Sequence, residues 1–325
     1  MSRRAKLLWL YWERFGILAI LALALIVFAF LTPTILSANN LLTVLSRSAI
    51  VGIPAMGMTF AICSGGFDLS VGSIVGLSTC VWASALPVIG IVPATVLTLA
   101  AGALCGLLNG LAITRLKIQT FVATLAMGMI LRGVALVYTN GSKQMINRSA
   151  NIEAKIFSQN VTVFGRQIQL MPLVLMFTVY ILGYLLYRYT RFGVYTRGTG
   201  SNEPSARTAG VRVNTVLTLV FVLTGVTASL SSLITASQLM QGAATLGTGF
   251  ELEVITAAIL GGTSLAGGKG NIWGSMIAAV MLALTRNGLN MLGLSEEYQR
   301  LAIGVILLIA LAVSGIRELM REAHK

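Results

Sequence analysis

The stretch Gly65-Gly66-Phe67-Asp68-Leu69-Ser70-Val71-Gly72-Ser73 decides how this chain is interpreted. It separates an apolar run at residues 49–62 from a second run that continues from residue 74 to residue 92 without a charged residue. Irregular backbone at membrane depth is tolerated only where it packs in protein or lines a water-filled cavity. A carboxylate at that depth is costly and indicates a function, so Asp68 is the first candidate site residue.

The composition is that of a polytopic membrane protein. Hydrophobic residues make up 56% of the 325 residues and charged residues only 10%, with a mean hydropathy of +0.86. Soluble domains carry about 25% charged residues. We therefore predict an all-α protein in which one transmembrane domain, residues 1–325, contains the whole chain.

The apolar runs predict the membrane spans, since a spanning helix needs roughly 20 residues. Strong spans are predicted at residues 16–31, 92–113, 120–138, 171–187, 215–237, 272–292 and 301–315. Three shorter runs border glycine-rich breaks, and the sequence leaves open whether they cross the membrane or re-enter it: residues 49–62, 74–86 and 254–265. Counting them gives about ten spans.

The distribution of positive charge predicts the topology. With about ten spans and both termini in the cytoplasm, most Lys and Arg residues fall on the cytoplasmic side, as the positive-inside rule requires. The net charge of +13 is therefore interpreted as a topology signal. No basic patch interleaved with aromatic residues indicates binding to nucleic acid, and we expect lipid to surround the protein instead.

Two polar segments are long enough to have structure of their own. Residues 139–170 are placed outside the membrane and have room for a short helix or a hairpin. Residues 189–213 are placed inside, and within them residues 201–210 carry a capping residue, an early proline and a closing glycine. A helix this short needs a surface to pack on. It is either a simple loop turn or a docking helix for a cytoplasmic partner.

Enzymatic chemistry finds no support in the sequence. The sole histidine, His324, lies at the end of the chain, where fraying is common. Residues 262–270 fail as a phosphate-binding loop, because two glycines precede Lys269 and Gly270 replaces the Ser or Thr that holds magnesium. We expect no catalytic residue, no metal site and no cofactor in this chain, so ATP-driven transport would require a separate ATPase.

A second glycine-rich break, residues 261–274, repeats the pattern of the first. Each break follows Gly-Gly, contains hydroxyl side chains and ends in a Gly-Ser pair. Transporters use broken helices to place polar groups near a pathway, although small residues also allow helices to pack closely. The candidates for a pathway are Ser70, Ser73, Thr263 and Ser264. The alternative is that these hydroxyls bond their own backbone.

Charged residues within predicted spans need partners. An isolated charge near the centre of a membrane costs about 2.5–3.5 kcal/mol, which makes Arg132 and Arg286 candidate site residues. For Arg286 the expected partners are Asn287, Asn290 or a second subunit, and snorkelling to the interface is the alternative.

Two interpretations of Asp68 stay open. The carboxylate either accepts hydrogen bonds from nearby backbone amides, Ser70 or Ser73, or it pairs with Arg132 or takes part in a gate.

Several motifs, in this order along the chain, resemble the permeases of bacterial ABC importers for ribose, arabinose, galactose and xylose. Together they cover nearly the whole sequence: residues 65–73, 124–133, 191–193, 198–211, 251–270 and 287–293. The resemblance implies an inner-membrane permease that moves a monosaccharide from periplasm to cytoplasm, with a fold like that of the vitamin B12 importer. The partners implied are a second permease subunit, usually identical, a cytoplasmic ATPase that binds ATP and magnesium, and a periplasmic sugar-binding protein.

The resemblance also assigns residues 189–213 as the loop that couples the permease to the ATPase. The residues that match the family pattern are Asn202, Glu203, Ser205, Ala206, Arg207 and Gly210. Pro204 departs from that pattern and leaves the start of the helix open. Ala206 and Ala209 are predicted to share one face and allow close approach to the ATPase, and Glu203 and Arg207 to pair along the helix.

Two other functions compete with this one. An ion-coupled secondary sugar transporter would use Asp68 for proton coupling, but it has no reason to keep a docking helix. A membrane-embedded enzyme lacks catalytic groups. The sequence does not determine which sugar is carried or whether the two permease subunits are identical.

Overall fold

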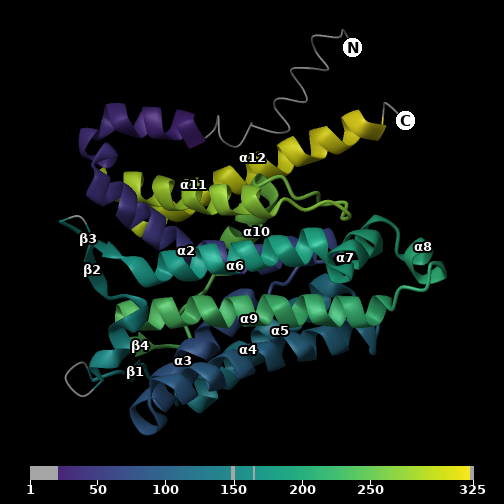
Figure 1. The fold of residues 1–325 in the computed structure, drawn as a ribbon, viewed down its shortest axis with the longest axis horizontal. Coiled ribbons are helices and arrows are strands. Elements are labelled where there is room, and N and C mark those ends of the chain that lie inside the picture. The colour runs from purple at the N-terminus through teal and green to yellow at the C-terminus, as the bar shows by residue number, and fades with distance from the viewer. Residues whose placement is uncertain (1–20, 148–150, 164, 323–325) are drawn as a thin grey trace.

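The computed structural model describes residues 21–147, 151–163 and 165–322, and these are mainly helical (Figure 1). The helices are Leu21–Leu31, η1 (Pro33–Leu36), α2 (Ala38–Cys63), α3 (Val71–Ile89), α4 (Ile91–Thr114), α5 (Thr120–Tyr138), η2 (Ile152–Phe157), α6 (Leu170–Tyr189), α7 (Arg191–Ser201), α8 (Glu203–Thr208), α9 (Val213–Leu239), α10 (Phe250–Leu260), α11 (Ile272–Met291) and α12 (Glu296–Glu322). The strands are β1 (Gln144–Met145), β2 (Asn160–Val163), β3 (Arg166–Gln169) and β4 (Gln241–Gly242).

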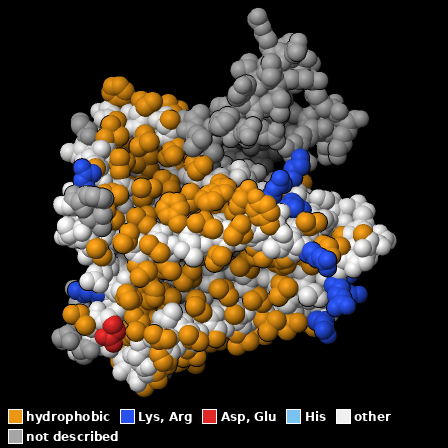
Figure 2. Space-filling model, viewed as in Figure 1, with side chains coloured by type: hydrophobic (Ala, Val, Ile, Leu, Met, Phe, Trp, Pro, Cys, Tyr) orange, Lys and Arg blue, Asp and Glu red, His pale blue; other side chains and the backbone are white. Residues whose placement is uncertain are grey.

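The long helices form a bundle with two distinct ends. In Figure 1, α6, α9 and α11 run along the horizontal axis, with the strands at the left and α8 at the right. We call these the strand end and the α8 end. Figure 2 shows hydrophobic side chains over the middle of this face, with Lys and Arg side chains gathered towards its two ends. This is the surface expected of a protein surrounded by lipid.

Seven helices among the described residues are long and apolar enough to cross a membrane: α2, α3, α4, α5, α6, α9 and α11. In α2, α3, α9 and α11 more than half of the most apolar window is buried, whereas α4, α5 and α6 expose most of theirs. The second group therefore forms an outer layer around the first. Residues 49–62 and 74–86, for which the sequence left open whether they cross the membrane or re-enter it, lie in helices α2 and α3, and both helices are long enough to cross.

The third short run behaves differently. After β4 pairs with β1 at the strand end, residues 243–249 continue without helix beside α3, and α10 then carries the chain to the α8 end. Close approach is possible because α3 has Gly72 and Gly76 here, where an added Cβ would overlap the backbone of residues 244–247. This pass through the bundle is thus made in two pieces, a series of turns and a short helix.

Small residues also join the outer layer to the core. Gly102, Gly106 and Gly110, spaced one turn apart on α4, face α9, and a Cβ at any of them would overlap atoms of α9. Such spacing lets two helix backbones approach closely in a membrane. For these glycines the packing interpretation is confirmed.

The polar segment at residues 139–170 contains both structures that were considered for it. Residues 152–157 form the short helix η2, and β2 and β3 form an antiparallel hairpin in which Val161 pairs with Ile168. Of the predicted first span, residues 16–20 lie outside the described residues, as do both termini and His324.

Candidate functional site

The first glycine-rich break is held by a buried carboxylate. Asp68 is fully buried. Its Oδ1 accepts hydrogen bonds from the backbone N–H of Ser70 (2.9 Å) and from the Ser70 hydroxyl (2.6 Å), and its Oδ2 accepts one from Thr224 of α9 (2.6 Å). Asn109 of α4 donates to Ser70 Oγ at 2.7 Å and, more weakly, to Asp68 Oδ1 at 3.4 Å. One carboxylate therefore ties the break to two helices.

This network bears on the two interpretations of Asp68. Ser70 donates to the carboxylate as expected, whereas Ser73 lies buried beside Gly128 of α5 and makes no hydrogen bond to Asp68. Arg132 does not pair with Asp68 among the described residues, because its guanidinium is engaged elsewhere. The structure thus provides Asp68 with the neutral donors that stabilise a buried carboxylate.

Arg132 forms hydrogen bonds with the non-helical segment before α10, residues 243–249. Its Nη1 donates to the carbonyl oxygens of Ala244 and of Leu246, the latter at 2.8 Å. Residues 243–249 lack the hydrogen bonds of a helix, and unpaired carbonyls inside a membrane cost several kcal/mol each, on the order of a lost hydrogen bond in hydrocarbon. The prediction that this charge has a partner is confirmed, and the partner is backbone.

Arg286 pairs with an acid that the sequence did not indicate. Its Nη2 lies 2.6 Å from Oε1 of Glu253 in α10, so its partner is neither Asn287 nor Asn290. Asn287 instead accepts a hydrogen bond from Asn40 of α2 at 2.9 Å. The pairing was missed because Glu253 is 33 residues away, on the short helix whose path the sequence left open.

The second break, residues 261–271, lies at the α8 end against α7. Gly268 donates its backbone N–H to the carbonyl of Cys63 at 2.8 Å, and Gly270 donates to the Tyr187 hydroxyl at 2.8 Å. Gly200 of α7 sits between the two breaks, since a Cβ there would overlap the Cys63 carbonyl oxygen and lie 2.8 Å from Gly268 N. The helix that leads into α8 therefore touches both breaks.

The Thr263 hydroxyl contacts the loop of the second break itself. Thr263 is buried, and its Oγ1 lies 3.5 Å from the backbone N of Asn271. In the same loop the backbone N–H of Ser264 donates to the Lys269 carbonyl at 3.0 Å. These two residues lie at the α8 end, and Ser70 and Ser73 lie within the bundle.

The helix predicted at residues 201–210 is α8, and a further helix, α7, precedes it directly. α7 ends at Ser201 and α8 covers Glu203–Thr208, with Asn202 as its N-cap, accepting a hydrogen bond from Ser205 N at 2.9 Å. Pro204 occupies the first turn, where a missing N–H costs nothing. Gly210 follows with a φ of 81°, the left-handed conformation that ends many helices.

The exposed face of α8 differs from the expected one. The predicted ion pair is present, with Arg207 Nη2 2.7 Å from Glu203 Oε1, and Arg207 also donates to Asn214 of α9 at 2.9 Å. Ala206, however, is only 7% exposed within this single chain, whereas Ala209 is exposed. The two alanines therefore do not share an outward face, because Ala206 lies against the chain itself.

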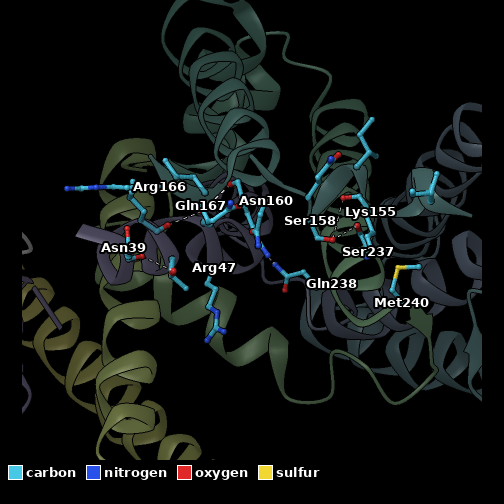
Figure 3. A pocket seen from close by; sticks show the side chains of 18 of the residues that line it. Asn39, Arg47, Lys155, Ser158, Asn160, Arg166, Gln167, Ser237, Gln238 and Met240 are labelled. Carbon is cyan, nitrogen blue, oxygen red and sulfur yellow. Dashed lines mark hydrogen bonds between the residues drawn. The ribbon is translucent and has the colours of Figure 1, made fainter. Parts of the chain in front are cut away.

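A large polar cavity opens at the strand end, and the sequence did not indicate it. We call it the basin. Its volume is about 1310 Å³, and its walls come from the first turns of α2, from η2, from the β2–β3 hairpin and from the end of α9. Figure 3 shows Asn39 and Arg166 on one side, Ser158 and Ser237 on the other, and Arg47 and Gln238 between them.

The basin offers amide, hydroxyl and cationic groups together. Gln238 Nε2 donates to Gln169 Oε1 at 3.1 Å, and Ser158 and Ser237 share a hydrogen bond of 2.8 Å. The charged side chains on its walls are Arg47, Glu153, Lys155 and Arg166. Such a surface suits a ligand rich in hydroxyl groups or a polar protein surface. Its lining residues come from three separate stretches of chain, so no local motif predicted it.

Metal chemistry has no evident site in the part of the chain that the structure describes. No three His, Cys, Asp or Glu side chains in it lie close enough together to hold a metal ion.

The chain is similar to known permeases over almost its whole length. Residues 40–311 match the family described as "Branched-chain amino acid transport system / permease component". The ribose import permease protein RbsC of Escherichia coli (strain K12) is 38% identical over 313 residues, 94% of each chain. RbsC of Bacillus subtilis (strain 168) is 36% identical over 89% of each chain. The fructose import permease protein FrcC of Rhizobium meliloti is 32% identical over 91% of this chain and 83% of its own. No solved structure matches the chain.

Proposed function

This chain belongs to the family of branched-chain amino acid transport system permease components, and from that premise we propose that it is the permease subunit of an ATP-driven monosaccharide importer. The observation that carries the proposal is the likeness, over about nine tenths of the chain, to permeases named for ribose and fructose import. The substrate class is therefore a sugar, despite the amino acid in the family description.

The position of the protein follows from the same premise. It is a multi-pass protein of the bacterial inner membrane, with seven apolar helices long enough to span. The helix Leu21–Leu31, the broken pass through α10 and helix α12 bring the number of passes to about ten, a value that the family resemblance also gives. In this topology the α8 end and both termini face the cytoplasm, and the basin faces the periplasm.

The partners follow from the likeness to sugar import permeases and from the exposed helix α8. ATP hydrolysis occurs in a separate cytoplasmic ATPase with bound magnesium, and two copies of the permease form the pathway. Helix α8 docks on the ATPase through Asn202, Glu203, Ser205, Arg207 and Gly210, with Ala206 anchoring the helix to its own chain. A periplasmic sugar-binding protein delivers the sugar at the basin. Asp68 and the two breaks link docking to the pathway.

Reconstitution tests the proposal against its alternative. The permease is placed in liposomes with its ATPase, its binding protein is added, and uptake of radiolabelled ribose and fructose is followed. We expect uptake of at least one sugar that requires ATP on the ATPase side. Uptake by the permease alone under an imposed proton or sodium gradient, with no effect of ATP, would instead establish an ion-coupled secondary transporter.

A further inference from the structure

A second, smaller cavity lies behind the basin, and we call it the inner chamber. Its volume is about 130 Å³, and Arg47 and Gln238 line both spaces. It lies between α2, α10 and α11, with the Glu253–Arg286 ion pair in its wall and Ile50 and Leu282 among its apolar residues. The basin and the inner chamber therefore share the side chains of Arg47 and Gln238 as a common wall, and the lining of the inner chamber is mainly apolar.

The polar groups of the inner chamber have hydrogen-bonding capacity to spare. Glu253 Oε1 accepts from Arg286, while no described residue donates to its Oε2. Gln238 uses one amide N–H on Gln169 and keeps its carbonyl oxygen. Arg47 makes no hydrogen bond or ion pair with any described residue. The chamber thus presents free acceptors and free donors beside apolar residues. Its volume of about 130 Å³ is below the roughly 300–1,000 Å³ of a complete ligand pocket, so it suits brief contact with part of a small ligand.

The charges of Glu253 and Arg286 compensate each other, because the two side chains form an ion pair of 2.6 Å. Arg47 adds one positive charge at the exposed side of the cluster. The side chains of Glu253 and Arg286 are 16% and 43% exposed, respectively, which leaves both accessible from the cavity. A sugar hydroxyl donates and accepts at the same time, so it can bridge a carboxylate oxygen and an amide or guanidinium group. A purely structural pair would not need this unused capacity beside it.

We propose that Glu253, Arg286, Gln238 and Arg47 form a transient binding site for a neutral monosaccharide inside the permease. This inference rests on the proposed function, and it assigns the site to the wall between α2, α10 and α11. The sugar leaves the basin past Arg47 and Gln238 and exchanges hydrogen bonds with the Glu253–Arg286 pair before it moves on. These residues therefore influence which sugar passes, in addition to the selection made by the binding protein.

The test uses the reconstituted complex with radiolabelled ribose, or with fructose if ribose is not carried. The variants are Glu253→Gln and Gln238→Leu, and the control is Glu296→Gln, which alters the exposed Glu296–Arg300 pair. We expect uptake to fall about tenfold in both variants, as for the loss of one hydrogen bond to the sugar. ATP hydrolysis stimulated by the loaded binding protein should persist, and the control should behave as the wild type.

Each outcome is decisive. If the Gln238→Leu variant takes up sugar at the same rate as the wild type, the inner site is overturned, even if Glu253→Gln fails to assemble. Loss of uptake together with loss of stimulated ATP hydrolysis in Gln238→Leu also overturns it, because the defect then lies in docking or folding. Absence of ATP-driven sugar uptake by the wild type would instead overturn the proposed function itself.

Discussion

The two glycine-rich breaks look alike in sequence but are held in different ways. Residues 64–70 are fixed by side chains, because Asp68 accepts hydrogen bonds from Ser70 and from Thr224 of α9. Residues 261–271 are held through their own backbone N–H groups: Gly268 donates to the Cys63 carbonyl, and Gly270 donates to the Tyr187 hydroxyl. The first break is therefore expected to respond to substitutions that remove a hydrogen-bonding side chain, and the second to substitutions that add volume at a glycine.

Both breaks meet at α7, and this gives the comparison its functional meaning. A Cβ added at Gly65 of the first break would lie 3.9 Å from the Cα of Gly200. In the second break, Gly267 packs against Gly200 and Gly268 packs against Ser201. A single residue, Asn202, separates α8 from α7, so the two helices are directly connected. A displacement of α7 thus acts on both breaks at once, which supports a role for α7 in linking ATPase docking to the pathway.

The largest expected effect is that of Gly200→Ala, which tests the contact between the breaks. The added Cβ would overlap the carbonyl oxygen of Cys63, which is backbone and cannot turn aside. Overpacking of this kind costs about 1–3 kcal/mol. We expect a lower thermal unfolding temperature of the purified complex and loss of uptake.

Gly198→Ala is the matched control for this change. It lies on the same helix, and an added Cβ there meets nothing within 4 Å. Its unfolding temperature and uptake should equal those of the wild type. If Gly200→Ala behaves like Gly198→Ala, then α7 is not packed between the breaks as described.

A smaller effect is expected for Asp68→Asn, which tests the side-chain anchor. The amide can keep its oxygen on Ser70 but replaces the second acceptor with a donor, so Thr224 loses its carboxylate acceptor and keeps only the Phe221 carbonyl. A hydrogen bond to a charged group contributes about 1.5–3 kcal/mol. We expect stability and uptake to fall together, and Thr224→Val to cause a milder loss of both.

The outcome separates an anchor from a gate. A gate predicts an assembled complex of normal stability whose ATP hydrolysis continues without uptake. That result for Asp68→Asn, with Thr224→Val unchanged, would contradict the anchor and favour gating.

The features that the sequence predicted correctly depend on local patterns. The apolar runs indicated the long helices, and the cap, proline and glycine around Asn202 and Gly210 indicated α8. The pairing of Glu203 with Arg207 follows from helical spacing alone. The apolar runs at residues 49–62 and 74–86 are shorter than α2 and α3, because residues such as Asn40, Arg47 and Ser73 lower the hydropathy without ending the helix.

What the sequence did not predict depends on segments that are distant in the chain. The basin combines α2, η2, the hairpin and α9, and the partner of Arg286 comes from α10. The inward position of Ala206 depends on how α8 lies against its neighbours. Tertiary packing decides each of these, and no single stretch contains the necessary information.

A third prediction compares the breaks with the basin as routes for water. Single cysteines at Arg47, Gln238, Ser73 and Thr263 are labelled with a water-soluble thiol reagent after Cys63, Cys80 and Cys105 have been replaced. Ser73 and Thr263 are buried, whereas Arg47 is exposed on the basin wall. We expect rapid labelling of the two basin positions and slow labelling at the breaks in the nucleotide-free complex.

A change with nucleotide would sharpen this result. Labelling at Ser73 or Thr263 that rises when an ATP analogue is bound would mean that the breaks open into the pathway during transport. Equal labelling at all four positions in every state would contradict the difference in burial on which the comparison rests.

The smallest effect is expected for Asn202→Ala, at the joint through which α8 reaches α7 and the breaks. The substitution removes the side-chain oxygen that accepts from Ser205 N–H at 2.9 Å, and loss of an N-cap costs about 0.5–2 kcal/mol. Because α8 has only six residues, this loss frays it without disturbing the bundle. We expect weaker co-purification with the ATPase and reduced uptake at an unchanged unfolding temperature. Asn202→Asp keeps an acceptor at the cap and should restore both, whereas equal binding by Asn202→Ala would mean that the ATPase docks elsewhere on the cytoplasmic face.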